Sequence, residues 1–270
     1  MARSNYQIPR LHSKNVLPKL PSRVEHSPEA FGFLSIDGDG SGVRICIIDT
    51  GFPHHPEIAV PMTNIVNFTQ SAECQDRHGH GSGVAGIIKA RGPNLVGLSP
   101  MADVFFAKAL SDKGLGEHGS VQAAVLYAVV KRADIIVMSF GSESSHPVLK
   151  EAIRKAYERG SVIFAASGVT HGSSAKDAQY PARFPEVMSV GLGPARVSKD
   201  IAGAFNIDFP VKTIETLYLD GQFTHMSGTS IVPPIAAGIA ARIIQRRRAQ
   251  GQDVAPAAIY QHMMNGFDRP

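Results

Sequence analysis

The chain has 270 residues, of which 43% are hydrophobic and 19% are charged, which suffices for one large buried core in a single domain. The formal net charge is +4 at pH 7, but basic residues are dispersed apart from Arg246-Arg247-Arg248, so nucleic-acid binding is not indicated. No apolar run reaches the roughly 18 residues that a membrane-spanning helix needs, so no membrane partner is expected.

The first residues are polar and contain proline, and they include no apolar stretch of the kind found in a secretory leader. Only two cysteines, Cys46 and Cys74, are present. Two cysteines do not form a disulfide framework of the kind that secreted domains use. We therefore expect a cytoplasmic protein with reduced cysteines.

The first regular element is predicted near residue 43. The apolar run 43–48 is typical of a buried parallel strand, and it ends at Asp49 before a glycine turn. Such a strand delivers Asp49 to its carboxyl end. Further on, residues 84–88 predict a buried helix, with His80 at the start of that helix in a glycine-rich segment.

Residues 104–166 alternate between two kinds of pattern. Strand, helix, strand, helix and strand are predicted in turn over residues 104–110, 119–131, 134–140, 147–159 and 161–166. This alternation is typical of βαβ units. We expect an α/β fold with a doubly wound, mostly parallel sheet and helices on both faces, in which residues at the carboxyl ends of the strands form the site.

Ser230 lies in a turn of small residues directly before an apolar helix. Pro233 and Pro234 mark the first turn of that helix, because a proline there leaves no intrahelical hydrogen bond unmade. The helix is predicted to run to about Arg246. Its N-terminus would stabilise negative charge beside Ser230, which suits a nucleophile, although a serine at this place can also be a simple helix cap.

Three motifs follow one another in the chain: Asp-Thr-Gly at residues 49–51, His-Gly-Ser-Gly-Val-Ala-Gly at 80–86 and Ser-Gly-Thr-Ser at 227–230. In order and spacing they resemble the subtilisin-like serine proteases (subtilases), and the layout is similar to that of intracellular subtilisins. The resemblance begins at about Lys19. It implies the subtilisin-like fold, with one catalytic domain over residues 19–270 after an N-terminal extension over residues 1–18.

The resemblance implies a role for each polar residue of the three motifs. Ser230 would attack the scissile carbonyl to form an acyl-enzyme, and His80 would take the serine proton. Asp49 would hold the other imidazole nitrogen. His78 competes with His80, but only His80 is followed by Val-Ala-Gly in the family's register.

A polypeptide substrate is implied by the same resemblance, bound as an extended strand. Two segments would line its site: Ser139, Phe140 and Gly141 on one side, and Ala166, Ser167 and Gly168 on the other. A buried strand followed by a turn accounts for both segments as well. His171 and His225 lie near motif residues and could enter the site, but a position at the surface or at the rim is expected for each.

The chain departs from the family's pattern at Val169. Subtilisins have an asparagine here whose amide donates to the oxyanion, and in subtilisin itself its loss slows the reaction by about 10² to 10³. The backbone N–H of Ser230 remains as a donor. We expect a serine endopeptidase with an atypical oxyanion hole at Val169 and Ser230. The alternative is a catalytically impaired subtilase-fold protein that acts as a peptide-binding or regulatory module.

Residues 2–17 loosely resemble the short arm that lies in the cleft of intracellular subtilisins. Pro9 would disfavour productive cleavage there, because it fixes its backbone and lacks an N–H. The arm is therefore either an inhibitor of its own chain or a terminus that lies on the surface.

The chemistry that the resemblance implies needs no cofactor. Subtilases often bind structural Ca²⁺, and Glu57 and Asn94 are the candidate ligands, but the loop of Asn94 has no acid and carries Arg91. A metal hydrolase built on His78 and His80 would lack the His-Glu-x-x-His pattern.

Overall fold

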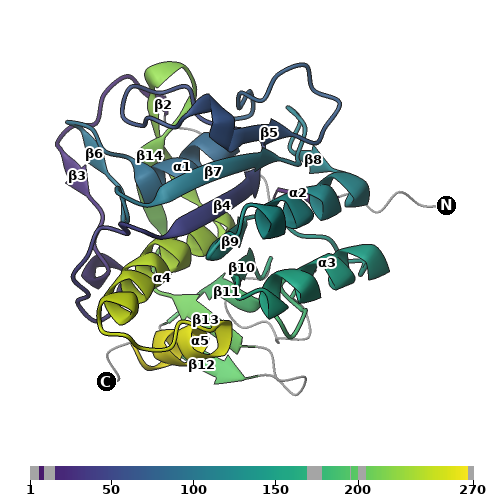
Figure 1. The fold of residues 1–270 in the computed structure, drawn as a ribbon. Helices are drawn as coiled ribbons and strands as arrows, with labels where there is room; N and C mark the ends of the chain where they lie inside the picture. The colour runs from purple at the N-terminus through teal and green to yellow at the C-terminus, as the bar shows by residue number, and fades with distance from the viewer. Residues whose placement is uncertain (1–5, 9–15, 169–177, 195, 200–204, 267–270) are drawn as a thin grey trace.

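The computed structural model describes residues 6–8, 16–168, 178–194, 196–199 and 205–266. Its centre is a sheet of eight strands, all parallel except the edge strand β12 (Figure 1). From one edge to the other the strands are β12 (Arg196–Lys199), β13 (Phe205–Phe209), β11 (Met188–Leu192), β10 (Val162–Ala166), β9 (Ile135–Met138), β4 (Arg44–Asp49), β7 (Asp103–Lys108) and β5 (Ile65–Asn67).

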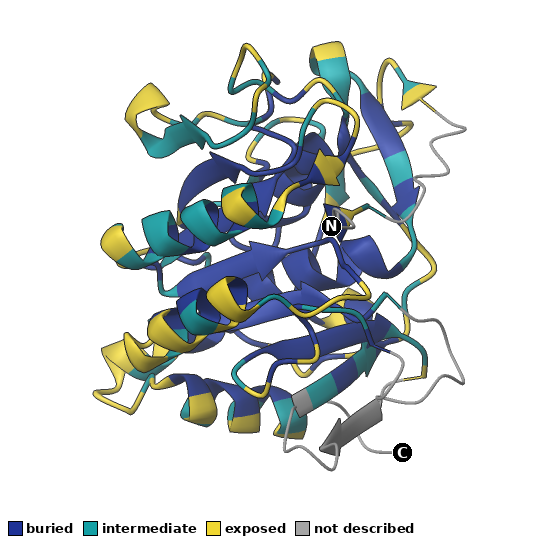
Figure 2. Cartoon of the chain, turned by 90° about the vertical axis from the view of Figure 1, so that its right-hand side faces the viewer, coloured by how far each residue is buried: buried dark blue, intermediate teal, exposed yellow. Residues whose placement is uncertain are grey.

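Helices cover both faces of this sheet. One face carries α2 (His118–Val130) and α3 (Pro147–Glu158), and the other carries α1 (His80–Lys89), α4 (Val232–Ala249) and α5 (Pro256–Asn265). Strand side chains alternate between the two layers, so that Ile45 and Ile47 join the core under α4 whereas Cys46 and Ile48 join the core under α2. The inner strands β4, β7, β9 and β10 are almost wholly buried (Figure 2). The predicted doubly wound α/β fold is therefore confirmed.

Sequence patterns located most of the central elements to within two residues. β7 ends at Lys108 rather than at residue 110, because its partner strand β4 ends at Asp49, whose carbonyl accepts the N–H groups of both Ala109 and Leu110. α4 continues to Ala249, three residues beyond the predicted end. Its last turn contains the arginine triplet 246–248, where cations face the negative end of the helix dipole.

Smaller elements surround the sheet, and the sequence did not predict them. They are the strand pairs β1 (Tyr6–Gln7) with β8 (Leu115–Gly116) and β3 (Val24–Glu25) with β6 (Leu95–Val96), the sheet of β14 (Thr213–Leu217), β15 (Phe223–Ser227) and β2 (Val16–Leu17), and the short 3₁₀ helices η1 (Glu29–Phe31), η2 (Met62–Asn64), η4 (Leu219–Gly221) and η5 (Thr229–Ile231).

Two further expectations concern the compartment of the protein. In the part of the chain that the structure describes, no helix is both long and apolar enough to cross a bilayer. Both cysteines are free thiols, one of them buried in β4. Burial raises the pKa of that Cys46 thiol far above its usual range, so it stays protonated.

Candidate active site

Asp49 and His80 meet at the carboxyl edge of the sheet. Asp49 ends β4, between β9 and β7, and His80 begins α1. Nδ1 of His80 lies 2.7 Å from Oδ1 of Asp49, and the two side chains are 0% and 1% exposed. The carboxylate holds a proton on Nδ1, which leaves Nε2 as the basic nitrogen. Among the described residues Nε2 has no hydrogen-bond partner, so its lone pair is available.

Asp76 organises the loop that leads into α1. One of its oxygens accepts the N–H groups of His78 and Gly79, at 2.9 and 3.0 Å, together with the hydroxyl of Thr50 at 2.8 Å. The other oxygen accepts both the N–H and the hydroxyl of Ser82, each at 2.7 Å. This buried carboxylate thereby fixes the start of α1 and the position of His80 on it. Sequence analysis missed it, although an acidic residue just before a helix start is a capping signal.

Lys108 also links the loops around Asp49 and His80. Its ammonium is fully buried and donates to the carbonyls of Thr50 and Gln75, at 2.6 and 3.0 Å, and to Asp112 at 2.6 Å. Three donors thus meet three acceptors, as a buried ammonium requires. Lys108 is also the neighbour of Asp49 across the sheet. It therefore connects the turn after β4 to the loop before α1.

Ser230 lies in η5, the 3₁₀ turn directly before α4. Gly228 precedes it with φ of 91°, a conformation that a glycine adopts readily. The Ser230 hydroxyl is buried and donates to the carbonyl of Ser139 at 3.1 Å. η5 packs against α1, the helix that begins with His80. The structure therefore brings the three motif residues to one edge of the sheet, with the serine hydroxyl turned to Ser139 rather than to the imidazole.

The two segments predicted to line a peptide site lie at the same edge. β9 and β10 are neighbouring parallel strands, so the residues that follow them emerge side by side. They are Ser139, Phe140 and Gly141 after β9, and Ala166, Ser167 and Gly168 at the end of β10. Phe140 is fully buried rather than exposed to solvent.

Two expectations lie outside the described residues. Val169, the proposed replacement for the oxyanion asparagine, is one, and His171 at the rim is the other. The described part of this wall ends at Gly168, whose φ is +73°. The other of these two histidines, His225, is on β15, where its Nε2 is 3.3 Å from a carboxylate oxygen of Glu215.

The N-terminal residues 6–8 occupy the edge beside Gly141. The N–H of Gln7 donates to the carbonyl of Gly141 at 3.0 Å, and the N–H of Gly141 donates back to Gln7 at 3.2 Å. On its other side β1 pairs antiparallel with β8. An extended segment of the chain itself is therefore hydrogen-bonded on both sides, where a peptide substrate was expected to add as a strand.

His78 lies beside His80 in this region. The two ring centroids are 6.3 Å apart with the rings edge-on, and the His78 side chain is half-buried next to Gly114. Burial lowers the pKa of His78, and the neighbouring His80 lowers it further. His78 is therefore a neutral imidazole at the site, and it makes no contact with Asp49 of the kind that His80 makes.

Glu57 and Asn94, the candidate calcium ligands, contact each other directly. The Asn94 side-chain amide donates to Glu57 at 2.7 Å, and the backbone N–H groups of Asn94 and Leu95 donate to the same carboxylate. N–H donors thus face the oxygens that a cation would need. Across the described ranges, no three His, Cys, Asp or Glu side chains converge as metal ligands would.

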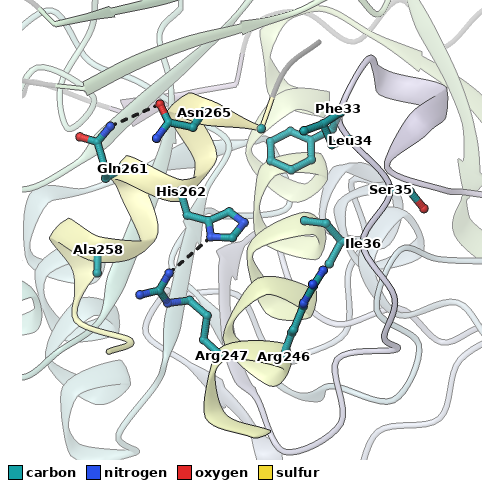
Figure 3. Close-up of a pocket in the computed structure, with 11 residues that line it drawn as sticks. Phe33, Leu34, Ser35, Ile36, Arg246, Arg247, Ala258, Gln261, His262 and Asn265 are labelled. Carbon is teal, nitrogen blue, oxygen red and sulfur yellow. Dashed lines mark hydrogen bonds between the residues drawn. The ribbon is translucent and has the colours of Figure 1, made fainter. Parts of the chain in front are cut away.

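A separate hollow lies at the other end of α4 (Figure 3). Residues 33–36, Arg246 and Arg247 line it together with α5, and Arg247 contacts Nδ1 of His262 at 3.4 Å. Sixteen residues of helical rise, about 24 Å, separate Arg246 from Ser230. This hollow is therefore not part of the Asp49, His80 and Ser230 arrangement.

Comparison with known proteins gives matches over most of the chain. A family model described as "Subtilase family" matches residues 40–268. The "Minor extracellular protease Epr" of Bacillus subtilis (strain 168) is 33% identical over 221 residues, covering 78% of this chain and 33% of that protein. The "Intracellular serine protease" of Paenibacillus polymyxa is 30% identical over 240 residues, covering 83% and 74%. "Subtilisin BL" of Lederbergia lenta is 31% identical over 214 residues, covering 77% and 78%. The chain thus spans only a third of the length of the Epr protease.

A solved structure has the same fold. "Sphericase" superposes with a TM-score of 0.74, covering 92% of this chain and 91% of that one at 23% sequence identity. At that identity the likeness concerns the fold alone.

Proposed function

This chain belongs to the subtilase family, and we propose that it is a serine endopeptidase that uses Asp49, His80 and Ser230. The observation that carries the proposal is the 2.7 Å contact between the buried His80 Nδ1 and Asp49 Oδ1, with Nε2 left unbonded at the edge where Ser230 lies. Two of the relatives named above are called proteases, one of them a serine protease. The substrate is a polypeptide, bound along residues 139–141.

The chemistry follows from these three groups. Rotation about the Ser230 side-chain bond moves the hydroxyl from Ser139 toward His80, which takes its proton as the oxygen attacks the scissile carbonyl. Asp49 stabilises the imidazolium that forms. His80 then returns the proton to the leaving amine, and a water molecule, deprotonated by the same imidazole, hydrolyses the acyl-enzyme. No step requires a metal or an organic cofactor.

Stabilisation of the oxyanion is the step for which this chain lacks a residue that its family has. Valine at position 169 has no side-chain donor, so we propose that the backbone N–H of Ser230 and the N-terminal end of the η5 and α4 segment carry the stabilisation. Losing one donor of this kind costs about 10² to 10³ in kcat, as it does in subtilisin itself. Slow hydrolysis is the expected result.

A fluorophosphonate probe tests the proposal, because it reacts only with an activated serine. The full-length protein is expected to gain one adduct, located on Ser230 by peptide mass, and Ser230→Ala is expected to gain none. Ser139→Ala serves as the matched control for a serine at the same edge, and it should still be labelled. Absence of an adduct on the folded protein both with and without residues 2–17 would favour the peptide-binding module.

We also propose that residues 6–8 inhibit their own chain by holding the substrate position. The reciprocal bonds between Gln7 and Gly141 support this, since a substrate strand would need the same two groups. A cytoplasmic location fits such a device, and the similarity to an intracellular serine protease supports it. Control by the chain's own arm would limit proteolysis inside a cell.

Replacing Gln7 by proline is expected to raise kcat/KM at least about fivefold, because it removes the N–H that donates to Gly141 and one hydrogen bond contributes about 1 kcal/mol. Gln7→Ala is the matched control, since it keeps the N–H and changes only an exposed side chain. Steady-state hydrolysis of a fluorogenic peptide measures both. Equal kcat/KM values for the two variants would contradict inhibition by the arm.

A further inference from the structure

Tyr6 is buried more completely than its position near the start of the chain would suggest. It belongs to a strand of two residues, yet it is 0% exposed. Its ring is edge-on to Phe140, with centroids 5.5 Å apart, and edge-on to His118, with centroids 5.0 Å apart. We call the site formed by Leu110, Gly116, His118 and Phe140 the Tyr6 pocket.

The pocket has a shape that accepts a large ring. A Cβ on Gly116 would come within 2.4 Å of Leu110 and 3.5 Å of the Tyr6 Cβ, so this position has no room for a side chain. Tyr6, Leu110 and Phe140 all belong to the buried cluster on the α2 and α3 side of the sheet. Apolar contact therefore fixes the ring and leaves only the phenolic oxygen to be matched.

His118 provides a hydrogen-bond partner for the phenolic oxygen. The Tyr6 hydroxyl lies 3.2 Å from Nδ1 of His118, the first residue of α2. Burial lowers the pKa of His118, and the neighbouring His146 lowers it further, so the imidazole is neutral at neutral pH. Burial raises the pKa of Tyr6 well above its usual range, so the phenol keeps its proton. A neutral imidazole and a neutral phenol form one hydrogen bond.

His146 holds the His118 ring in place. The two rings are stacked with centroids 4.3 Å apart and an angle of 25° between their planes. His146 directly precedes α3, which packs against α2. The direction of Nδ1 is therefore set by the packing of the helix ends, and the hydrogen bond to a phenol in the pocket needs no rearrangement.

The geometry points to His118 as a specificity residue that selects tyrosine over phenylalanine in the Tyr6 pocket, an inference that rests on the proposed peptidase function. Tyr6 directly precedes Gln7, the residue that pairs with Gly141 as a substrate would. The substrate class is therefore a polypeptide with tyrosine immediately before the residue bound to Gly141. Phenylalanine would fill the pocket, but it has no hydroxyl to form the hydrogen bond with Nδ1 of His118.

The test compares two fluorogenic peptides that differ only in tyrosine or phenylalanine at this position, with the full-length enzyme. The ratio of the two kcat/KM values is independent of competition by the arm, because the arm lowers both values by the same factor. We expect the tyrosine peptide to be preferred about threefold to tenfold, the effect of one neutral hydrogen bond. In His118→Leu the ratio should fall to about 1, chiefly through KM. His118→Gln, which keeps a polar group, should restore part of it.

A matched control and a second readout make the outcome decisive. His262→Leu, on α5 and away from the pocket, should keep the wild-type ratio. Affinities of the same two peptides for full-length Ser230→Ala give the ratio without hydrolysis, so a chain that binds but does not cut still tests the inference. A ratio near 1 in the wild type, or one that His118→Leu leaves unchanged, would overturn the role of His118. Lack of the serine adduct alone would overturn only the peptidase proposal.

Discussion

Replacing His80 by alanine should lower kcat for peptide hydrolysis by about 10⁶-fold, the size of loss that removal of the catalytic histidine has in subtilisin. His80 is the imidazole that contacts Asp49, and its free nitrogen is the base available to Ser230. Without it the serine hydroxyl stays protonated at neutral pH. Single-turnover hydrolysis of a peptide substrate at high enzyme concentration would measure a loss of this size.

His78→Ala is the control for that experiment, because His78 is two residues away and its ring lies 6.3 Å from that of His80. It should keep kcat within about tenfold of the wild type, since no proton transfer in the mechanism uses it. Equal losses of kcat in the two variants would show that both substitutions act by disturbing the loop, and not by removing the general base. A larger loss in His78→Ala would assign the base to His78.

Replacing Asp76 by alanine should lower the free energy of unfolding by at least about 4 kcal/mol. Five donors lose their shared acceptor, and a buried donor left unpaired costs about 1–3 kcal/mol, part of which entering water would recover. The start of α1 would lose its anchor at the same time. Urea unfolding with a fixed m value is the measurement.

Glu73→Ala provides the comparison within the same loop. Glu73 is 55% exposed and pairs with Arg77, which is 51% exposed, so its removal should cost less than about 1 kcal/mol. If Asp76→Ala were no more destabilising than Glu73→Ala, the five hydrogen bonds would not be what fixes the loop.

The central sheet and the motif residues could be predicted because their signals are local. An apolar run that ends in a carboxylate places Asp49, a glycine-rich turn before a helix places His80, and prolines in a first turn place Ser230. Each of these patterns lies within about ten residues of the chain. Each reflects a local backbone preference that does not depend on which distant segment packs against it.

The role of Lys108 could not be predicted, because two of its three hydrogen-bond partners come from separate segments. Lys108 reaches Thr50 and Gln75, which lie 58 and 33 residues away in sequence. In the sequence it is an ordinary lysine at the end of a strand, where a solvent-exposed charge is the usual expectation. The contact of the Ser230 hydroxyl with Ser139 was hidden for the same reason, since it spans 91 residues.

The two-residue strand that pairs with Gly141 belongs to the same molecule as the site it covers. Its occupancy is therefore governed by an effective concentration, which reaches the millimolar range for short connections, and not by how much protein is present. Dilution would empty a site blocked by a second molecule but leaves this one filled. Under the proposed inhibition, a substrate competes with a segment that never diffuses away, so at low substrate concentration only tightly bound sequences would be cleaved.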